Sequence, residues 1–332
     1  MHELAFPLLV GLIAIALAFD FLNGLHDAAN SIATVVSTRL LSPVAAVVFA
    51  AFGNFAAYWL VGLHVAETVG KGIVDKDAVT PAVVFGALIG AMFWNVVTWL
   101  KGIPSSSSHA LIGGLLGAGI AHGGFDVVES SGTTKTVIAI FLSPVIGFAL
   151  AMLMVLITSW LFKGFQPRRA EGVFKSLHLV SSAAYSISHG GNDAQKTMGI
   201  ITVLLYSTGH LKGEFHVPEW VVISCYAAIA LGTMSGGWRI IKTMGTKITK
   251  LNHHTGFSAS TAGSIVVFGA SAFGIPVSTT HAITGSVIGT GAARKASAVR
   301  WGIAGRVVTA WFITIPASAG VGAVFYVLTR MF

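Results

Sequence analysis

Residues 103–110 of this chain read IPSSSSHA, and residues 275–282 read IPVSTTHA. Each stretch is followed by an apolar segment in which two glycines recur with the same spacing, at 113 and 117 and again at 285 and 289. Proline followed by hydroxyl side chains is typical of a helix start, because proline suits the first turn and hydroxyls can cap free N–H groups. The return of the whole pattern at an offset of 172 residues predicts two related halves.

Two shorter matches support a duplication. The stretch GLHDA at 24–28 returns as GGNDA at 190–194, and ETVG at 67–70 is echoed by KTMG at 242–245. The matches follow the same order in both halves, at nearly constant offset. The sequence is therefore expected to divide into a first repeat, a basic linker and a second repeat, at 1–165, 166–176 and 177–332.

The composition predicts an integral membrane protein. Hydrophobic residues make up 54% of the chain, charged residues only 10%, and the mean hydropathy is +0.80, which a soluble core could not accommodate. Both repeats are thus expected to be transmembrane, in an all-α polytopic bundle surrounded by membrane lipid. Continuous apolar stretches long enough to cross about 30 Å of hydrocarbon recur at about 4–22, 41–65, 80–100, 136–162, 177–205, 217–235, 257–273 and 307–328.

Two further features of composition narrow the function class. The net charge of +8 comes from basic residues in short loops, which positive-inside placement explains better than nucleic-acid binding. Cys225 is the single cysteine, which excludes an intrachain disulfide and a cysteine metal cage.

The first apolar run lacks a small-residue cleavage pattern, so we expect it to be retained.

Loop charges predict how the two repeats are oriented. The loop at 67–77 has a net charge of −1, whereas its counterpart at 239–250 has +4, and the same contrast separates 122–135 from 294–306. Basic loops stay on the cytoplasmic side of a membrane, so equivalent loops should face opposite sides. We therefore expect an inverted-topology repeat, as in many secondary transporters, in the cytoplasmic (inner) membrane with the linker on the cytoplasmic side.

The hydroxyl-rich stretches are candidate anion-binding elements. About a dozen apolar residues follow each one, too few to span a bilayer, so two re-entrant helical hairpins with tips near the midplane are expected. Opposed helix N-termini present free N–H groups to an anion. The alternative is ordinary packing between helices. Side chains expected to contact a tetrahedral oxyanion are Ser105, Ser106, Ser107, Ser108, Ser278, Thr279 and Thr280.

Asp27 and Asp193 are candidate cation-coupling residues, since they stand at matching positions within apolar flanks. A carboxylate inside a membrane costs several kcal/mol unless paired or hydrated, which marks it as functional by default. Each aspartate could hold a proton, or could ligate Na⁺ together with Asn30, Asn192 and backbone carbonyls. The alternative is an aspartate that caps a helix at the membrane surface. Asp20 is a weaker candidate, because the second half has no equivalent.

Basic side chains beside these motifs have two interpretations each. His26, next to Asp27, could relay a proton or simply donate a hydrogen bond. His109 and His281 could donate to the substrate or brace the hairpin tips. Lys196 could neutralise an anion or pair with a carboxylate such as Asp193.

The stretches GLHDAAN at 24–30 and HGGNDAQK at 189–196, with the two Pro-Ser/Thr-His stretches, resemble the paired signatures of the inorganic phosphate transporter (PiT) family. The resemblance covers essentially the whole chain in order. It implies phosphate symport by a carrier that is often a homodimer, with phosphate between the hairpin tips. It also implies cation sites at the aspartate motifs, which carries over to Asp27, Asn30, Asn192 and Asp193, with Gln195 as a supporting residue.

One departure bears on the coupling ion. Many sodium-coupled relatives have Asn-Asp in both halves, whereas the first half here reads His26-Asp27. This variant is similar to the bacterial low-affinity, proton-coupled branch, which favours H⁺ over Na⁺. That branch is also associated with neutral metal phosphate complexes, so a divalent metal could travel with the substrate.

Two rival functions remain open. A sulfate permease of the same fold would use the same donors, but sulfate carries no proton near neutral pH and needs no acceptor, so two matched aspartates favour phosphate. A membrane-embedded hydrolase would use Ser108 or Thr280 with His109 or His281 and an aspartate. Neighbouring residues on a helix do not face each other, so we expect a carrier without cofactor rather than an enzyme.

Overall fold

The computed structural model describes residues 6–331, in which every named element is helical. The predicted apolar run at 4–22 therefore begins outside the described residues. The first half contains α1 (Phe6–Ser37), α2 (Pro43–Leu60), α3 (His64–Lys71), η1 (Lys76–Ala78), α4 (Pro81–Lys101), α5 (Ser107–Gly123), η2 (Phe125–Val127) and α6 (Ser130–Leu161). The second contains α7 (Pro167–Ser207), α8 (Glu219–Ser235), α9 (Trp238–Lys242), η3 (Thr243–Lys247), α10 (His253–Ala272), α11 (Thr279–Arg294), η4 (Ala296–Ala298) and α12 (Trp301–Thr329).

The two halves repeat the same succession of elements. α1, α2, α4, α5 and α6 correspond in order to α7, α8, α10, α11 and α12, and one 3₁₀ turn, η2 or η4, separates the last two helices of each half. Gly102 ends α4 with φ of 63°, and Gly274, 172 residues later, follows α10 with φ of 65°. Only glycine adopts this left-handed conformation readily, so the same tight turn recurs in both halves.

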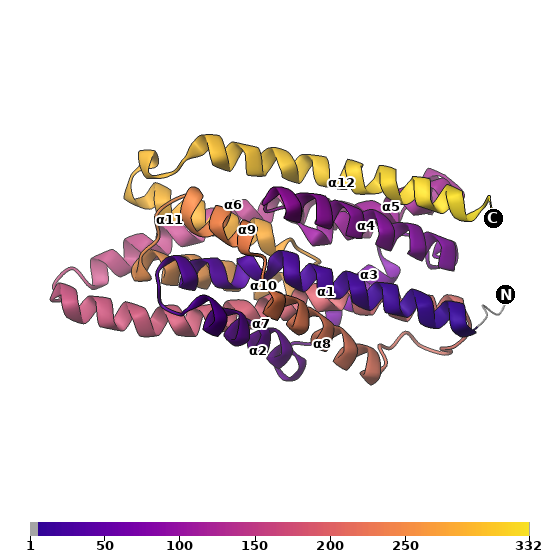
Figure 1. Cartoon of the computed structure of the whole chain (residues 1–332), viewed down its shortest axis with the longest axis horizontal. Helices are drawn as coiled ribbons and strands as arrows, with labels where there is room; N and C mark the ends of the chain where they lie inside the picture. The colour runs from indigo at the N-terminus through magenta and orange to yellow at the C-terminus, as the bar shows by residue number, and fades with distance from the viewer. Residues whose placement is uncertain (1–5, 332) are drawn as a thin grey trace.

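The helices form an elongated bundle with the start of α1 and the end of α12 at one end and the α6–α7 connection at the other (Figure 1). α7 starts at the end opposite to the start of α1 and runs back. Residues 167–176 of the predicted linker form the first turns of α7, so the non-helical connection between the halves is short.

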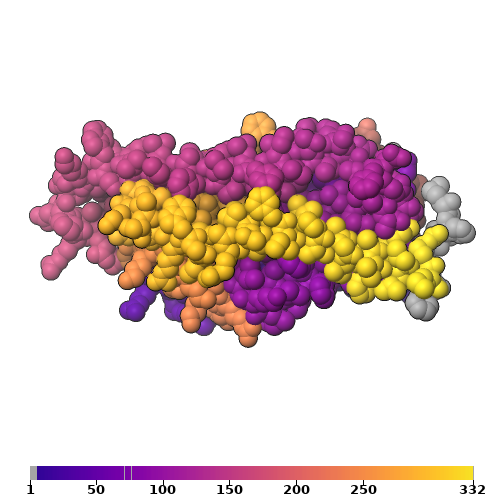
Figure 2. Space-filling view, turned by 90° about the horizontal axis from the view of Figure 1, so that it is seen from above, coloured from indigo at the N-terminus to yellow at the C-terminus, as the bar shows by residue number. Residues whose placement is uncertain are grey.

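The short helix of each half packs against the long helix of the other half. α5 lies against α12, and α11 lies against α6. A Cβ atom on Gly117 would meet the Ala319 carbonyl oxygen at 2.0 Å, and one on Gly289 would meet the Phe148 carbonyl oxygen at 2.2 Å. These glycines let the backbones approach closely, as in other lipid-embedded helix pairs. α12 itself runs along the surface of the molecule (Figure 2).

Five helices in the described part are long and apolar enough to cross a membrane, namely α1, α2, α4, α6 and α12. A sixth span results if α8 and the segment at 238–247, bent by 63° relative to each other, count as one. The predicted apolar stretches at 177–205 and 257–273 lie in α7 and α10, which do not meet this criterion. Both helices bury many polar side chains, which lowers their mean hydropathy.

Two helical hairpins, α4–α5 and α10–α11, carry the hydroxyl-rich stretches at their turns. The predicted place of the prolines is wrong, because Pro104 and Pro276 lie in the turns rather than in a first helical turn. The caps are Ser106 and Ser278, whose hydroxyls accept hydrogen bonds from the N–H groups three residues on. Of these four helices only α4 is both long and apolar enough to count as a span, so the depth of the hairpins stays a prediction.

Candidate functional site

The polar centre of the molecule lies where the middle of α1 and the middle of α7 meet the two hairpin turns. Asp27 and Asp193 are both buried, with 2% and 0% of their surface exposed, and so are the predicted hydroxyl residues. Four of these hydroxyl residues, Ser107, Ser108, Thr279 and Thr280, bond directly to the two aspartates.

Asp27 accepts hydrogen bonds from both hairpins. Ser107 Oγ, at the start of α5, donates to Asp27 Oδ2 at 2.5 Å. Thr280 Oγ1, in the first turn of α11, donates to Asp27 Oδ1 at 3.4 Å. Asn30, one turn further along α1, donates to Thr280 Oγ1 at 2.9 Å. The carboxylate of the first half is thus held by donors from both halves.

Asp193 shows the same pattern with the halves exchanged. Thr279 Oγ1 donates to Asp193 Oδ2 at 2.8 Å, and Ser108 Oγ donates to Asp193 Oδ1 at 3.3 Å. Ser107 corresponds to Thr279, and Ser108 to Thr280, by the offset of 172 residues. Each aspartate therefore accepts from the first residue of the short helix in its own half. It also accepts from the second residue of the short helix in the other half.

Lys196 is buried and pairs with Asp193, its ammonium group donating to Asp193 Oδ1. The same group donates to Ser108 Oγ at 2.6 Å and to the Val277 carbonyl oxygen at 2.8 Å. Of the two roles weighed from the sequence, pairing is the one that the structure shows. Lys196 also joins the turns of both hairpins, since Ser108 and Val277 belong to different ones.

His26 links Asp27 to α4. Its Nδ1 atom hydrogen-bonds with Asp27 Oδ1 at 2.7 Å, and its Nε2 atom hydrogen-bonds with Thr98 Oγ1 at 3.0 Å. Ser105 Oγ donates to Thr98 Oγ1 at 2.9 Å, and so belongs to this chain of bonds rather than to the pair of aspartates. The two ring nitrogens of His26 thus lie in a continuous chain of hydrogen bonds from Asp27 to Ser105, as a proton relay requires.

Ser106 and Ser278, two of the predicted substrate residues, are N-caps. Their hydroxyls accept from the backbone N–H groups of His109 and His281, at 3.2 Å and 3.1 Å. Capping fixes the first turns of α5 and α11 and thereby the hydroxyls that bind the aspartates. The contacts that the structure shows for these two hydroxyls therefore position the helices.

The remaining amide side chains brace the surrounding helices. Asn192 donates to Ser271 Oγ on α10 at 2.8 Å. Gln195 accepts from the backbone N–H groups of Val65 and Ala66 and donates to Gly62. Asn192 therefore does not repeat the contact that Asn30 makes to the hairpin of the other half.

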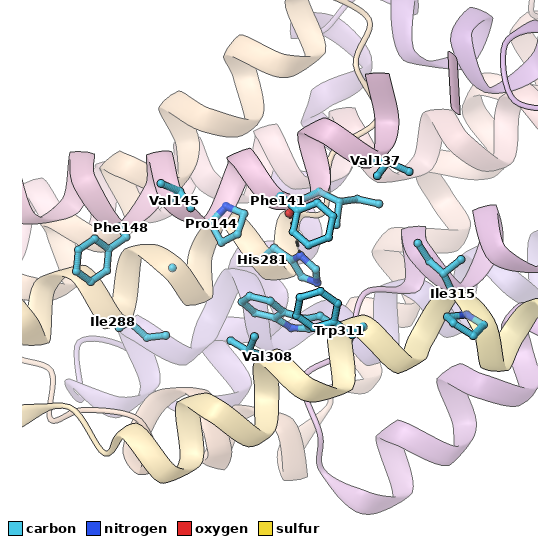
Figure 3. Close-up of a pocket in the computed structure, with 14 residues that line it drawn as sticks. Val137, Phe141, Pro144, Val145, Phe148, His281, Ile288, Val308, Trp311 and Ile315 are labelled. Atoms are coloured by element: carbon cyan, nitrogen blue, oxygen red, sulfur yellow. Dashed lines mark hydrogen bonds between the residues drawn. The ribbon is translucent and has the colours of Figure 1, made fainter. Parts of the chain in front are cut away.

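His109 and His281 lie against each other, with their ring centroids 4.3 Å apart and edge to face. His281 stacks on Trp311 with a centroid distance of 3.8 Å and borders an apolar groove of about 570 Å³ between α6, α11 and α12 (Figure 3). Neither ring nitrogen of His109 has a hydrogen-bond partner among the described residues. The histidines brace the hairpins against each other, and neither bonds to Ser108 or Thr280 as a catalytic pair would.

Sequence reasoning left three residues of the cluster unassigned. Asn23 Oδ1 accepts from Ser107 Oγ at 2.6 Å, Thr98 bonds to His26, and His189 Nε2 lies 3.2 Å from Asp193 Oδ2. Asn23 precedes Asp27 by four residues, and His189 precedes Asp193 by four residues, which is about one helical turn. Residues four apart lie on the same face of a helix, so this spacing could have indicated both side chains. Thr98 carries no comparable signal.

One group of side chains in the described part of the chain could hold a metal ion. Oxygen atoms of Asp27 and Asp193 and a ring nitrogen of His189 lie within 4.8 Å of one another, all buried. Two carboxylates and neighbouring hydroxyl oxygens suit Na⁺, and the imidazole would suit a divalent transition metal.

A helical bundle of this kind, with a buried polar cluster built by two related halves, is typical of multi-pass membrane transporters. The profile of the Phosphate transporter family matches residues 23–322. The chain belongs to this family, and it is a multi-pass protein of the cell membrane rather than an enzyme.

Relatives with closely similar sequences are named as transporters. The chain is 64% identical to a probable low-affinity inorganic phosphate transporter of Rhizobium meliloti (strain 1021) over 97% of both chains. It is 43% identical to one of Bacillus subtilis (strain 168) over 95% of both chains. A solved structure titled "The sodium-dependent phosphate transporter" matches 98% of this chain and 100% of its own with a TM-score of 0.91 and 25% sequence identity.

Proposed function

We propose that this protein imports inorganic phosphate by symport with H⁺, at the cluster around Asp27 and Asp193. The observation that carries the proposal is the crossed arrangement of Ser107, Ser108, Thr279 and Thr280, each of which donates to a buried carboxylate. Such hydroxyls and the helix N-termini behind them are the donors that a tetrahedral oxyanion requires.

Shared donors explain how anion and cation could be coupled. Phosphate entering between the hairpin turns would accept hydrogen bonds that the hydroxyls now give to the aspartates. A buried carboxylate that loses its donors is costly unless it gains a proton or a cation. Phosphate and cation would therefore favour each other's binding, as symport demands. A phosphate that keeps a proton could in turn donate to an aspartate, which sulfate could not.

The identity of the cation is the finer part of the proposal. His26 stands where the second half has Asn192, and its bonds to Asp27 and Thr98 suit a proton path, which favours H⁺. Na⁺ is the alternative, because the aspartates lie close together and a related solved structure is named as sodium-dependent. The group of Asp27, His189 and Asp193 could also accept a divalent metal that travels with phosphate.

The membrane arrangement belongs to the same proposal. α1 and α7 start at opposite ends of the bundle (Figure 1), which supports an inverted-topology repeat with the basic loops of the second half in the cytoplasm. We also expect, from the family resemblance, that the hairpins enter the membrane only in part. The same resemblance leads us to expect a homodimer.

Uptake of radiolabelled phosphate into proteoliposomes tests the proposal. A proton gradient and a sodium gradient are imposed separately, with excess unlabelled sulfate as competitor. We expect the proton gradient to drive uptake and sulfate to leave it unchanged. Uptake that requires sodium would move the coupling to Na⁺, and sulfate-sensitive or absent phosphate uptake would reject phosphate as the substrate.

A further inference from the structure

Asp20 on α1 is a buried carboxyl group that the proposed phosphate site does not use. None of its surface is exposed, and neither carboxyl oxygen has a hydrogen-bond partner among the described residues. The other two buried acidic side chains of the described chain, Asp27 and Asp193, are held by hydroxyl donors and basic side chains. Asp20 is therefore in a different chemical situation from the aspartates of the paired motifs.

The surroundings of Asp20 are polar but without a direct counter-charge. Thr197 from α7, Cys225 from α8 and Asn23 on α1 itself are polar groups near its carboxyl group. The hydroxyls of Thr197 and Tyr226 have no hydrogen-bond partner among the described residues. The charged groups that face it are Asp193 and Lys196, which already pair with each other. Asp20 has no basic partner of its own, so binding of a proton would neutralise it.

Asp20 is connected to the central cluster along two helices. It precedes Asp27 by seven residues, which places both on one face of α1 about 10 Å apart along the axis. Asn23 lies between them and accepts a hydrogen bond from Ser107, the residue that also donates to Asp27. On α7, Thr197 lies one turn beyond Asp193. A change of charge at Asp20 can therefore reach both aspartates.

We propose that Asp20 is a proton-binding site of the transport cycle, separate from the paired aspartate motifs and loaded when phosphate binds. This proposal rests on the proposed phosphate/H⁺ symport. Burial without a partner disfavours the ionised carboxylate, so the group takes up a proton when the surrounding negative charge increases. The proton adds to a carboxyl oxygen, which can then donate to Asn23, and it leaves when phosphate is released.

The test compares the wild-type protein with Asp20→Asn in proteoliposomes that contain a pH-sensitive dye. Asparagine has the shape of the neutral acid but cannot release a proton. The number of protons moved with each phosphate should fall below the wild-type ratio, because one proton-binding group is lost. Phosphate exchange at equal pH on both sides, which needs no net proton transfer, should persist. Glu219→Gln, which removes an exposed carboxyl group on α8, should leave both activities unchanged.

The outcomes separate this proposal from the proposed function. If Asp20→Asn moves protons with phosphate at the wild-type ratio, Asp20 is not a proton site, while symport stands. If the wild-type protein moves phosphate without protons, both proposals fall. Should Asp20→Asn not fold, Asp20→Glu must restore phosphate-dependent proton movement, and its failure to do so while exchanging phosphate normally would overturn the assignment.

Discussion

Thr280, in the second half of the chain, donates a hydrogen bond across 3.4 Å to Asp27 in the first half. Ser108 of the first half donates to Asp193 of the second in the same way, at 3.3 Å. Neither half can therefore complete its carboxylate environment alone. A single central site, rather than two equivalent ones, follows from these crossed contacts.

Replacing Asp27 or Asp193 with asparagine should abolish cation-coupled phosphate uptake, but the two variants should differ in stability. Asp193 pairs with the buried ammonium of Lys196. Asp193→Asn leaves that charge without its partner, at a cost of about 3–5 kcal/mol. Asp27→Asn leaves no buried lysine behind. Uptake in proteoliposomes and thermal unfolding of the purified proteins in detergent measure the two effects.

A double variant provides the control for this pair. Asp193→Asn combined with Lys196→Met removes both charges, and should regain part of the stability lost in Asp193→Asn without regaining uptake. Equal unfolding temperatures for the two single asparagine variants would contradict the role of Lys196. Normal uptake by both would contradict the role of the aspartates.

Removal of the hairpin hydroxyls should weaken phosphate binding. Ser107→Ala and Thr279→Val each delete a donor to a charged group, worth about 1.5–3 kcal/mol, so each should raise the KM for phosphate about tenfold or more. The two effects should be similar because the residues are equivalent in the repeat. Ser235→Ala, which alters an exposed serine of α8, is the matched control. An unchanged KM in both hairpin variants would argue against phosphate binding at these turns.

Contact between α5 and α12 depends on Gly117. Gly117→Ala would place a Cβ atom 2.0 Å from the Ala319 carbonyl oxygen, so the two helices would have to separate. Overpacking of this kind costs about 1–3 kcal/mol, and thermal unfolding should occur at a lower temperature. Gly11→Ala on α1 is the control, since nothing lies within 4 Å of the added Cβ. Equal stability of the two variants would show that α5 and α12 are less closely packed.

Opposite orientation of the two halves can be tested with single cysteines. Cys225→Ala removes the one cysteine, after which Asp126→Cys and Ser297→Cys introduce thiols at the exposed equivalent turns η2 and η4. A membrane-impermeant maleimide added to intact cells should label position 126 and should reach position 297 only after permeabilisation. Labelling of both positions from the same side would reject the inverted arrangement.

Much of the fold followed from the repeated motifs. The matching hydroxyl-rich stretches predicted two helices with equivalent starts, and α5 and α11 begin at Ser107 and Thr279. The glycines at 113, 117, 285 and 289 recur because both short helices need close contact with a long helix. Span number was harder to predict, because α7 and α10 bury polar side chains that lower hydropathy without exposing them to water.

The hydrogen-bond partners inside the site could not be predicted from the sequence. A motif shows that Thr280 and Asp27 matter, but their contact joins residues 253 positions apart and depends on how the halves pack. For the same reason the hydrogen bond from Asn192 to Ser271 was not predicted. Lys196 had two interpretations until the buried position of Asp193 next to it was known.

The number of phosphate ions bound per chain tests the shared site most directly. Equilibrium binding of radiolabelled phosphate to the purified protein can be compared for wild type, for Ser107→Ala with Ser108→Ala, and for Thr279→Val with Thr280→Val. We predict one phosphate per chain in the wild type and loss of binding in both double variants, because each aspartate depends on both hairpins. Two phosphates per chain, or half of the binding left in each double variant, would contradict the account.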